Sequence, residues 1–553
     1  MYLKQNKYTP SNIYQSLGIA SAKVGVNRSI NWLNENILTW NKTFKDIHSL
    51  NILGGFTIQR NNVESVTGAS SNFVNDVMKY NNLGAGSIYD KPESSATQWS
   101  LMSYLARINY SLYDRYLFSV NGRVDGSSRF GGNNKYGFFP SGSVAWRISE
   151  EGFMEPVKAV INNLKLRTSY GFTGNTEIGV YESLATLGSN SWTIGNQLVS
   201  GFYPNRIPNP DLKWEKTGQF DIGFDLGLFN NRLRLTADYY YKKTTDLLYN
   251  VAIPSASGYD SMLKNIGSVQ NKGYELSIES DNLSGAFSWT TAFNISFNRN
   301  KVLELGGETY KDVGTYDDHL KTSDIRRLIV GQPIGVFYGY RFDGIFQNEA
   351  ECAQQTSSPS PIGVGLRRYK DLNGDGKIDA TNDREILGDA NPKFFGGMTN
   401  TFAYRGFELN VFLQYSYGNK IFNYNAMELE SPTGGQNVYQ DLVNRWTPTN
   451  PSNEYQKATT NRNNIVSDRF IEDGSFLKLK TVSLSYSFPK LNWKHIGGLR
   501  LYVTGQNLLT WTKYRGYDPE VSYRGASTLE AGEDFGGYPQ ARTFMFGIKL
   551  DIK

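Results

Sequence analysis

The residues with the clearest chemical spacing lie in DLNGDGKID, residues 371–379. Oxygen-bearing side chains occupy its first, third, fifth and ninth positions, and Gly376 stands at the sixth. Calcium loops of the EF-hand type take ligands from alternate positions and need glycine at the sixth for a sharp turn. Carboxylate and carbonyl oxygens suit hard cations, so the segment predicts a structural Ca²⁺ or Mg²⁺ site. Its candidate ligands are Asp371, Asn373, Asp375, Lys377 through its carbonyl, Asp379 and Asp383.

A metal-free turn is the alternative interpretation of this segment. Asn-Gly and Asp-Gly pairs favour turns without any ion, because Asn and Asp side chains accept hydrogen bonds from nearby backbone N–H groups. The twelfth position, where an EF-hand carries a bidentate glutamate, is Asn382. The flanking sequence predicts no helices, so a bound cation is expected to stiffen a loop rather than to act as a sensor.

Residues 391–419, NPKFFGGMTNTFAYRGFELNVFLQYSYGN, follow closely and predict two long strands joined by a tight turn at 404–406. The second strand has one apolar and one polar face. The apolar face carries Phe407, Leu409, Val411, Leu413, Tyr415 and Tyr417, and the polar face carries Glu408, Asn410, Gln414 and Ser416. This alternation over about 10 residues is typical of a strand in a membrane β-barrel.

The composition is compatible with a barrel and narrows the range of partners. The 553 residues carry a formal net charge of +5, which does not indicate a nucleic-acid partner. Mean hydropathy is −0.46, but alternating strands and polar loops keep this average low even in a barrel. No apolar run of 18 residues occurs, so no transmembrane helix is predicted. The single cysteine, Cys352, has no partner for an internal disulfide.

Apolar and polar residues alternate along most of the chain and predict about fifteen spanning strands. They cover 28–41, 46–60, 97–112, 115–128, 138–149, 163–174, 214–227, 232–246, 268–281, 286–301, the two strands of 391–419, and 475–488, 498–512 and 541–552. Short connections, such as 113–114 and 229–231, alternate with long ones, such as 61–96 and 175–213. Outer-membrane barrels have short periplasmic turns and long extracellular loops, so we expect the long connections outside the cell.

Residues 334–344, IGVFYGYRFDG, resemble a further strand. A spanning strand there would put a loop of about 50 residues on the periplasmic side, so we expect extended structure within the extracellular loop 302–393. Residues 1–27 are polar and are predicted to be an irregular extracellular segment, followed by the barrel at 28–553. The odd number of strands, and the lack of a basic start followed by an apolar core, predict the back part of a larger exported barrel.

Three further groups of side chains receive predicted roles. Aromatic residues of the long loops either contact cargo or, as we favour, pack the loops: Trp192, Phe202, Tyr203, Tyr316, Tyr439, Trp446, Tyr517 and Tyr523. Tryptophans near strand ends are expected in an interfacial girdle: Trp32, Trp40, Trp99, Trp146, Trp289 and Trp511. The charged residues Arg167, Asp221 and Glu275 are expected to line a wet lumen or to meet a plug.

Nothing in the sequence indicates an enzyme. The three histidines do not form an HExxH motif, and no GxSxG motif occurs. Paired carboxylates are too common in the loops to mark a catalytic centre. We therefore predict no catalytic residues and no organic cofactor.

At this point the residues resemble a known family, the SusC/RagA-type TonB-dependent transporters of Bacteroidota outer membranes. The resemblance covers most of residues 28–553 and rests on several segments that occur in the family's order. They are PNPDLKWEKT, NIGSVQNKGYELSIES, GQPIGVFYGYRFDGIFQ, residues 369–419, DGSFLKLKTVSLSYSFP, LRLYVTGQNLLTWTKYRGYDPEVS and YPQARTFMFGIKLDI. The chain differs from many barrel proteins in ending with Lys553 rather than an aromatic residue.

The resemblance implies an all-β, antiparallel transmembrane β-barrel of 22 strands, of which this chain supplies about fifteen, in contact with outer-membrane lipid. It implies import of oligosaccharides or peptides, together with a SusD-like surface lipoprotein. Coupling to TonB would run through an N-terminal plug and TonB box, which this sequence does not contain. The alternative is a complete small porin or an adhesin-type outer-membrane barrel without TonB coupling.

Overall fold

A computed structural model describes residues 1–13, 16–259, 261–314, 325–430, 437–460, 464–489, 496–525 and 527–552. The chain divides into two compact units. Unit 1 comprises Met1–Val144, Ser169–Gly218 and Thr244–Ile266, and unit 2 comprises Ala145–Thr168, Gln219–Lys243 and Gly267–Lys553. Both units consist mainly of long antiparallel strands.

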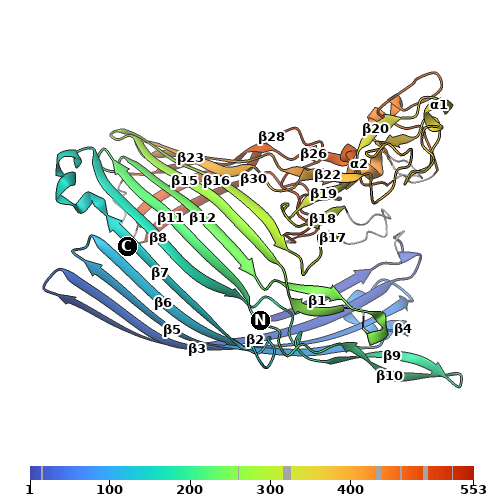
Figure 1. The fold of residues 1–553 in the computed structure, drawn as a ribbon, viewed down its shortest axis with the longest axis horizontal. Coiled ribbons are helices and arrows are strands. Elements are labelled where there is room, and N and C mark those ends of the chain that lie inside the picture. The colour runs from blue at the N-terminus through green and yellow to red at the C-terminus, as the bar shows by residue number, and fades with distance from the viewer. Residues whose placement is uncertain are drawn as a thin grey trace. The chain divides into compact units, whose positions relative to one another are not determined.

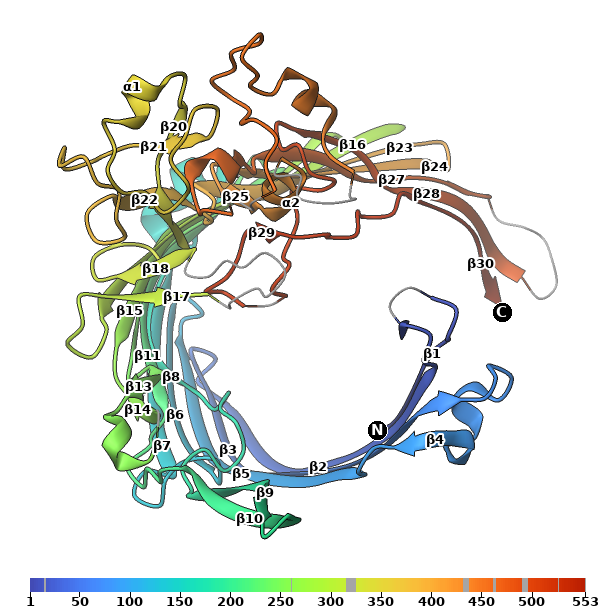
Figure 2. The ribbon, with the colours of Figure 1, turned by 90° about the vertical axis from the view of Figure 1, so that its right-hand side faces the viewer.

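Unit 1 is built on four long strands that follow one another along the chain and lie side by side (Figure 2). They are β2 (Ser21–Phe44), β3 (His48–Phe73), β5 (Glu93–Leu112) and β6 (Tyr116–Ser127). Each pairs with the next in antiparallel register, from Phe44 opposite His48 to Leu112 opposite Tyr116. The predicted strands in this part of the chain are confirmed, although β2 and β3 are much longer than expected.

The N-terminal segment differs from the prediction. β1 (Tyr2–Thr9) pairs with the first residues of β2, from Ser21 to Arg28. The prediction that residues 1–27 are irregular is therefore wrong, while their extracellular placement stays a prediction. β3 likewise continues into the expected loop 61–96, where β4 (Gly86–Tyr89) pairs with its last residues.

Four further strands, all predicted, have residues in both units. They are β7 (Tyr136–Arg147), β8 (Ile161–Asn175), β11 (Glu215–Leu228) and β12 (Leu233–Thr245). Two hairpins of unit 1 occupy segments predicted as loops. The first joins β9 (Thr186–Ile194) to β10 (Gln197–Arg206), and the second joins β13 (Leu248–Ala252) to β14 (Ser261–Asn265).

Unit 2 contains a second run of antiparallel strands (Figure 1). They are β15 (Ser268–Leu283), β16 (Phe287–Glu304), β23 (Phe394–Tyr404), β24 (Phe407–Tyr417), β27 (Phe476–Ser487), β28 (Ile496–Thr512) and β30 (Thr543–Ile552). Each pairs with the next in this order. The direct pairing of β16 with β23 confirms that the intervening residues are an insertion and contribute no strand between them.

The long connections of unit 2 carry small sheets of their own. The first comprises β17 (Tyr310–Val313), β18 (Arg326–Ile329), β19 (Val336–Tyr340) and β22 (Arg384–Asp389); the second comprises β20 (Phe342–Ile345) and β21 (Arg367–Tyr369); the third comprises β25 (Lys420–Asn423), β26 (Ile471–Asp473) and β29 (Glu533–Asp534). Residues 334–344 thus form β19 and the start of β20, which confirms extended structure inside the 302–393 connection.

Among the described residues, helices are few and short. The α-helices are α1 (Glu349–Cys352) and α2 (Tyr424–Leu429). Short 3₁₀ helices cover Lys79–Asn81, Leu83–Ala85, Ile148–Glu150, Gly152–Val157, Ser255–Ser257, Gln440–Asn444 and Asp468–Phe470. Across the described ranges, no helix has the length and apolar character needed to cross a membrane.

The short connections between long strands are tight turns with left-handed residues. Positive φ values occur at Lys45 and Asp46, at Tyr113 and Asp114, and at Arg405. Two consecutive residues with positive φ match the twist of a two-residue hairpin, which is the turn at 405–406 between the paired residues Tyr404 and Phe407. Gly406, with φ +88°, follows Arg405, and a Cβ there would lie 2.7 Å from the carbonyl oxygen of Ser487. The glycine is required at this turn both by its conformation and by its close neighbour.

Candidate functional site

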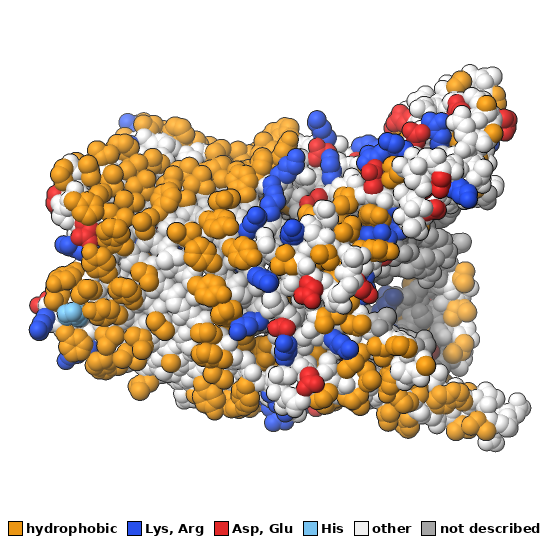
Figure 3. All heavy atoms as spheres, viewed as in Figure 1, with side chains coloured by type: hydrophobic (Ala, Val, Ile, Leu, Met, Phe, Trp, Pro, Cys, Tyr) orange, Lys and Arg blue, Asp and Glu red, His pale blue; other side chains and the backbone are white. Residues whose placement is uncertain are grey.

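The strands of unit 2 present two chemically unlike faces. On β24, Phe407 and Tyr417 are about half exposed on the apolar face. On the opposite face Glu408 accepts a hydrogen bond from Arg500 at 2.6 Å, and Gln414 donates one to Glu520 at 3.0 Å. Figure 3 shows hydrophobic side chains gathered over the left-hand part of β15 and β16, with Lys and Arg side chains toward the right. The apolar face therefore suits lipid, and the polar face suits water or protein.

An ionic cluster lies on the polar face of β8, β11 and β12. The Arg167 guanidinium is 2.6 Å from the nearer Asp238 carboxylate oxygen and 3.6 Å from oxygens of Asp221 and Asp225. Lys165 stands 3.9 Å from Asp225. The cluster thus brings together two of the predicted lumen charges, Arg167 and Asp221, and contains three carboxylates for two cations. Glu275 lies on neighbouring β15 and has no ion pair within the described part of the chain.

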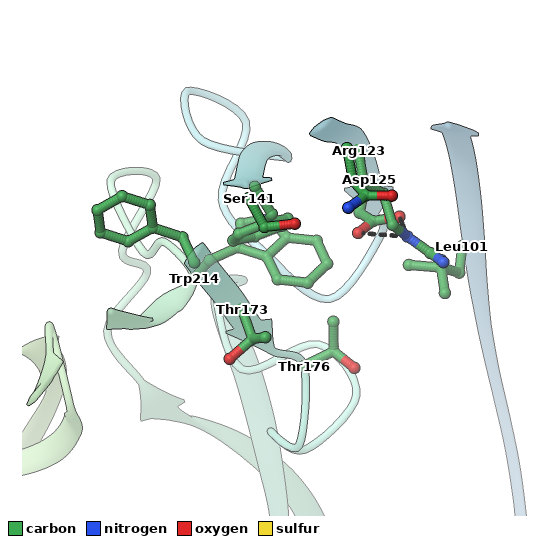
Figure 4. A pocket seen from close by; sticks show the side chains of 11 residues that line it. Leu101, Arg123, Asp125, Ser141, Thr173, Thr176 and Trp214 are labelled. Carbon is green, nitrogen blue, oxygen red and sulfur yellow. Dashed lines mark hydrogen bonds and ion pairs between the residues drawn. The ribbon is translucent and has the colours of Figure 1, made fainter. Parts of the chain in front are cut away.

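A cavity of about 420 Å³ opens on the strands of unit 1 (Figure 4). Leu101, Asn121, Phe139, Ser141, Phe172 and Thr173 contribute to its lining. Trp214 lies on one side, and the Arg123–Asp125 ion pair, with Nε–Oδ distances of 2.6 and 2.9 Å, lies on the other. The cavity therefore combines an aromatic wall with polar groups, which is the usual composition of a small-ligand site.

The long connections of unit 2 are held together by a buried hydrophobic core, which we call the loop core. It consists of Ile325, Phe337, Phe422, Tyr424, Ala426, Met427, Val466 and Phe470. Phe422 packs edge to face on Tyr424 and Phe470, with ring centroids 4.8 and 6.4 Å apart. The 302–393 and 420–474 connections thus share one core and form one packed body (Figure 2).

Ion pairs around the loop core connect segments that are far apart in the chain. Arg326 and Glu533 are each about 1% exposed, with the Nε–Oε1 distance at 3.1 Å. Burial raises the pKa of the Glu533 carboxyl, and the charges of Arg326 and Arg524 oppose this rise. Lys478 is equally buried and lies 2.7 Å from Asp518. These pairs attach the 513–540 connection to the rest of unit 2.

The predicted cation ligands form a self-contained set of turns. Asp371 accepts hydrogen bonds from the N–H groups of Gly374 at 2.6 Å and Gly376 at 2.7 Å. The backbone N–H groups of Asn382 and Thr381 donate to Asp379 and lower the pKa of its carboxyl. Asp383 is fully buried and accepts the N–H groups of Leu372 and Asp379, each at 2.8 Å.

Three candidates remain: Asn373 and Asp375 hydrogen bond to each other, and the backbone N–H of Lys377 donates to Asp375 at 2.8 Å. Within the described residues, no three His, Cys, Asp or Glu side chains converge on a point suited to a metal ion. The oxygen ligands are of the right chemical type, but their present contacts are those of a metal-free turn. The cation site stays a prediction.

The aromatic residues of the loops fall into two groups. Tyr439 packs against the loop core, the Trp446 indole N–H donates to Gln347 at 3.1 Å, and Tyr523 packs on Phe535 with centroids 5.3 Å apart. These three support the packing interpretation. Trp192 and Tyr203 contact each other across the β9–β10 hairpin, while Phe202 and Tyr517 are largely exposed. Tyr316 lies outside the described residues.

The tryptophans expected in an interfacial girdle also divide. Trp32, Trp40 and Trp511 are about half exposed. Trp99 lies under the Arg129 guanidinium at 4.7 Å. Trp146 and Trp289 donate their indole N–H groups to Glu151 and Asn400, both at 3.0 Å. An interfacial position suits all of these rings, and the girdle stays a prediction.

The sequence alone predicted neither the cavity of unit 1 nor the buried ion pairs of unit 2. Arg326 and Glu533 are separated by 207 positions, and Lys478 and Asp518 by 40. No short-range pattern marks such pairs. The Trp214 side of the cavity lies in PNPDLKWEKT, which the sequence indicated as part of the family resemblance and as the start of a strand, but not as part of a cavity. A signal for the β9–β10 hairpin was present in Gly195-Asn196, a dipeptide that favours a two-residue turn.

Comparisons with known proteins identify relatives along nearly the whole chain. The family model described as TonB dependent receptor-like, beta-barrel matches residues 3–345. The chain is 39% identical to TonB-dependent receptor P3 of Formosa agariphila, over 98% of this chain and 54% of that protein. It is 32% identical to TonB-dependent receptor SusC of Bacteroides thetaiotaomicron, over 83% of this chain and 44% of that protein. The chain thus spans about half the length of these curated relatives.

A solved structure also matches the fold. The RagAB peptide transporter superposes with a TM-score of 0.84 at 26% identity, covering 99% of this chain and 58% of the matched chain. The same complex, described as a peptide importer in its closed-closed state, superposes with a TM-score of 0.81. The alignment therefore includes the long connections that carry the small sheets.

Proposed function

Because the chain belongs to the SusC/RagA-type TonB-dependent receptors, which are β-barrel proteins of the outer membrane, we propose that it forms the wall of an energy-coupled importer. The superposition on the RagAB peptide transporter over 99% of the chain is the observation that carries this proposal. The two unlike faces of the strands agree with it, since an importer needs a lipid-facing surface and a polar interior.

The proposed cargo is an oligosaccharide or a peptide. The importer would work with a SusD-like surface lipoprotein and would be driven through TonB by parts of the protein outside the present sequence. The body of connections built on the loop core offers a firm outer surface on which such a lipoprotein can sit. The relatives are named as receptors and transporters rather than enzymes, and we assign no catalytic step to this chain.

Uptake by cells that lack the full-length gene tests this function. We expect the deletion strain to lose uptake of fluorescent oligosaccharides or oligopeptides that the parent strain takes up, and complementation to restore it. A protonophore should stop uptake in the parent strain, because transport through TonB uses the energy of the inner membrane. Equal uptake by deletion and parent strains would overturn the proposal.

The same experiment distinguishes the proposed importer from the alternative, a small porin or an adhesin-type barrel. A porin passes solutes by diffusion, so its contribution to uptake would persist when the inner membrane is de-energised. Gene-dependent uptake that continues unchanged in the presence of protonophore would therefore favour the porin. An adhesin would change surface attachment and leave uptake unaltered.

A further inference from the structure

Basic side chains gather where the lipid-facing surface of unit 2 ends. Figure 3 shows Lys and Arg side chains next to the hydrophobic ones over β15 and β16. On these strands Tyr274 and Phe297 belong to the apolar face, and side chains two residues apart on a strand point the same way. Lys272 and Arg299 are therefore turned outward as well. We call the exposed cations of this region the basic band: Lys243, Lys272, Arg299, Lys301 and Lys393.

The residue types on the outward face of the β15–β16 pair follow the layers of a membrane. Moving away from the short turn that joins the two strands, the cross-strand partners are first aliphatic, then Tyr274 with Phe297, and then Lys272 with Arg299. Aliphatic side chains suit hydrocarbon, aromatic side chains suit the interface, and basic side chains suit anionic headgroups. With the long connections placed outside the cell, the basic band lies at the headgroups of the outer leaflet.

The basic band carries positive charge that no acidic side chain balances within the described ranges. Lys272 and Arg299 are direct cross-strand partners, and like charges in this position destabilise a sheet. Among the described contacts, none of the band's side chains forms an ion pair. By contrast, Arg234 on the polar face of β12 pairs with Glu279 at 3.0 Å and with Asp281 at 3.1 Å. A group of like charges without internal partners is suited to an external anion.

A recess of about 200 Å³ opens beside Arg299 and Lys393. The Arg299 guanidinium is held in place, because its Nη1–H groups donate to the backbone carbonyls of Asn298 and Lys393 at 2.8 and 3.0 Å. Its Nε–H and Nη2–H groups make no hydrogen bond within the described part of the chain. Among the described lining residues the one carboxylate, Asp389, already accepts two hydrogen bonds from Asn391, at 2.9 and 2.7 Å. The positioned guanidinium thus keeps donors for an anion.

We propose that the basic band binds the phosphate group of an outer-leaflet lipid and holds that lipid against the outer wall of the barrel. Phosphate oxygens match the planar guanidinium of Arg299 in geometry and the lysine ammonium groups in charge. The exposed rings of Tyr274 and Phe297 lie next to the band and can cover the apolar part of a lipid, which a free anion lacks. The inference uses the outer-membrane location of the chain and is independent of its cargo.

Binding of lipid A, a phosphorylated glycolipid, tests the proposal, with dephosphorylated lipid A as the control ligand. Affinity for the full-length protein in detergent is measured by microscale thermophoresis. One variant combines Lys272→Gln with Arg299→Gln. The control variant combines Lys45→Gln with Arg405→Gln, because these two residues have the same chemistry, are exposed, and lie in short turns between long strands. Heat-modifiable migration in gels checks that each barrel has assembled.

We expect the unaltered protein to bind phosphorylated lipid A at least about 10-fold more tightly than the dephosphorylated form, since charge-assisted hydrogen bonds to phosphate are strong. The variant with Lys272→Gln and Arg299→Gln should bind it about 10-fold more weakly, and the control variant should stay within about 2-fold of the unaltered protein. Affinity should also fall as salt is raised, because exposed charges are screened.

Equal affinity for the two forms of lipid A, or equal affinity of the two variants for the phosphorylated form, would overturn the proposal. Inorganic phosphate and polyglutamate are measured as separate ligands. Inorganic phosphate bound as tightly as lipid A would assign the band to a free anion, and polyglutamate bound more tightly than lipid A would assign it to an acidic protein; either result overturns the lipid site. The measurement requires no transport, so its failure would leave the proposed import function standing.

Discussion

At the scale of single residues, the segment with the strongest chemical spacing makes its own hydrogen-bonded frame. Asp371 holds two glycine N–H groups, and Asp383 holds two more N–H groups while fully buried. A carboxylate oxygen that accepts one hydrogen bond still has a lone pair for a cation. The same residues therefore stabilise a metal-free turn, and their carboxylate oxygens keep lone pairs that a calcium ion could use.

Asp371→Ala should loosen the 302–393 connection by about 1–3 kcal/mol, because two N–H groups lose a charged acceptor. The calcium proposal adds that Ca²⁺ protects this connection from proteolysis in the unaltered protein and that Asp371→Ala removes this protection. Glu349→Ala, an exposed carboxylate of the same connection, is the control. Identical proteolysis of the unaltered protein with calcium and with chelator would support the metal-free turn. Failure of the Asp371→Ala barrel to assemble would contradict the placement of the segment in a loop.

Glu520 makes the attachment of the 513–540 connection sensitive to pH. Burial raises the pKa of its carboxyl, but hydrogen bonds from Lys478 and Lys480 outweigh this, and the pKa lies below its ordinary value of 4.5. Since the folded pKa is depressed, the stabilisation is present above about pH 4.5 and is lost as pH falls through the folded value. The protection of 513–540 against hydrogen exchange, measured relative to the intrinsic exchange rate at each pH, should fall in that range, and Glu520→Gln should abolish this fall. An unchanged pH profile in Glu520→Gln would contradict this assignment.

At the scale of elements, alternation predicted the strands whose two faces differ. All fifteen predicted strands are present, because an apolar face leaves a period of two in the sequence. β1 and the first residues of β2 were missed. YLKQNKYT has no consistent apolar face, whereas in SAKVGVNR Ala22, Val24 and Val26 alternate with polar residues and glycine, so a signal for this part of β2 was present. Their pairing is held by backbone hydrogen bonds, which leave no trace in side-chain type. The small sheets of the loops were missed because their strands are mostly three to six residues long, too short to show a period.

The β23–β24 hairpin depends on a single glycine. Gly406→Ala would place a Cβ 2.7 Å from the carbonyl oxygen of Ser487 in a left-handed conformation, so we expect a loss of about 1–3 kcal/mol. Gly152→Ala is the matched control, because its φ is not positive and a Cβ there meets no atom within 4 Å. The midpoint of urea-induced unfolding in detergent measures both. Equal midpoints for the two variants would show that the turn is not strained by a side chain.

At the scale of the whole molecule, some features of the candidate sites repeat along the chain, and others are formed by residues from distant segments. Lipid-facing and polar surfaces repeat strand by strand and were predicted. The cavity of unit 1 and the loop core of unit 2 require residues from distant segments, such as Arg123 with Trp214 or Phe337 with Phe470. A single sequence carries no record of which distant segments meet. Resemblance to a family supplied the fold and the class of function, but not these sites.

The buried pair of Arg326 and Glu533 tests whether the long connections of unit 2 act as one body. Among the described residues, Arg326→Met leaves the buried Glu533 paired with only the Arg524 guanidinium, 3.3 Å away, so we expect a loss of about 3 kcal/mol. Replacing both residues by methionine should recover part of that loss, because no buried charge then lacks its main partner. Protease protection of both the 302–393 and 513–540 connections should fall together in the single variant. Lys158→Met, which breaks the exposed pair with Glu155, should cost less than about 1 kcal/mol. Loss of protection confined to one connection would show that the two are held independently.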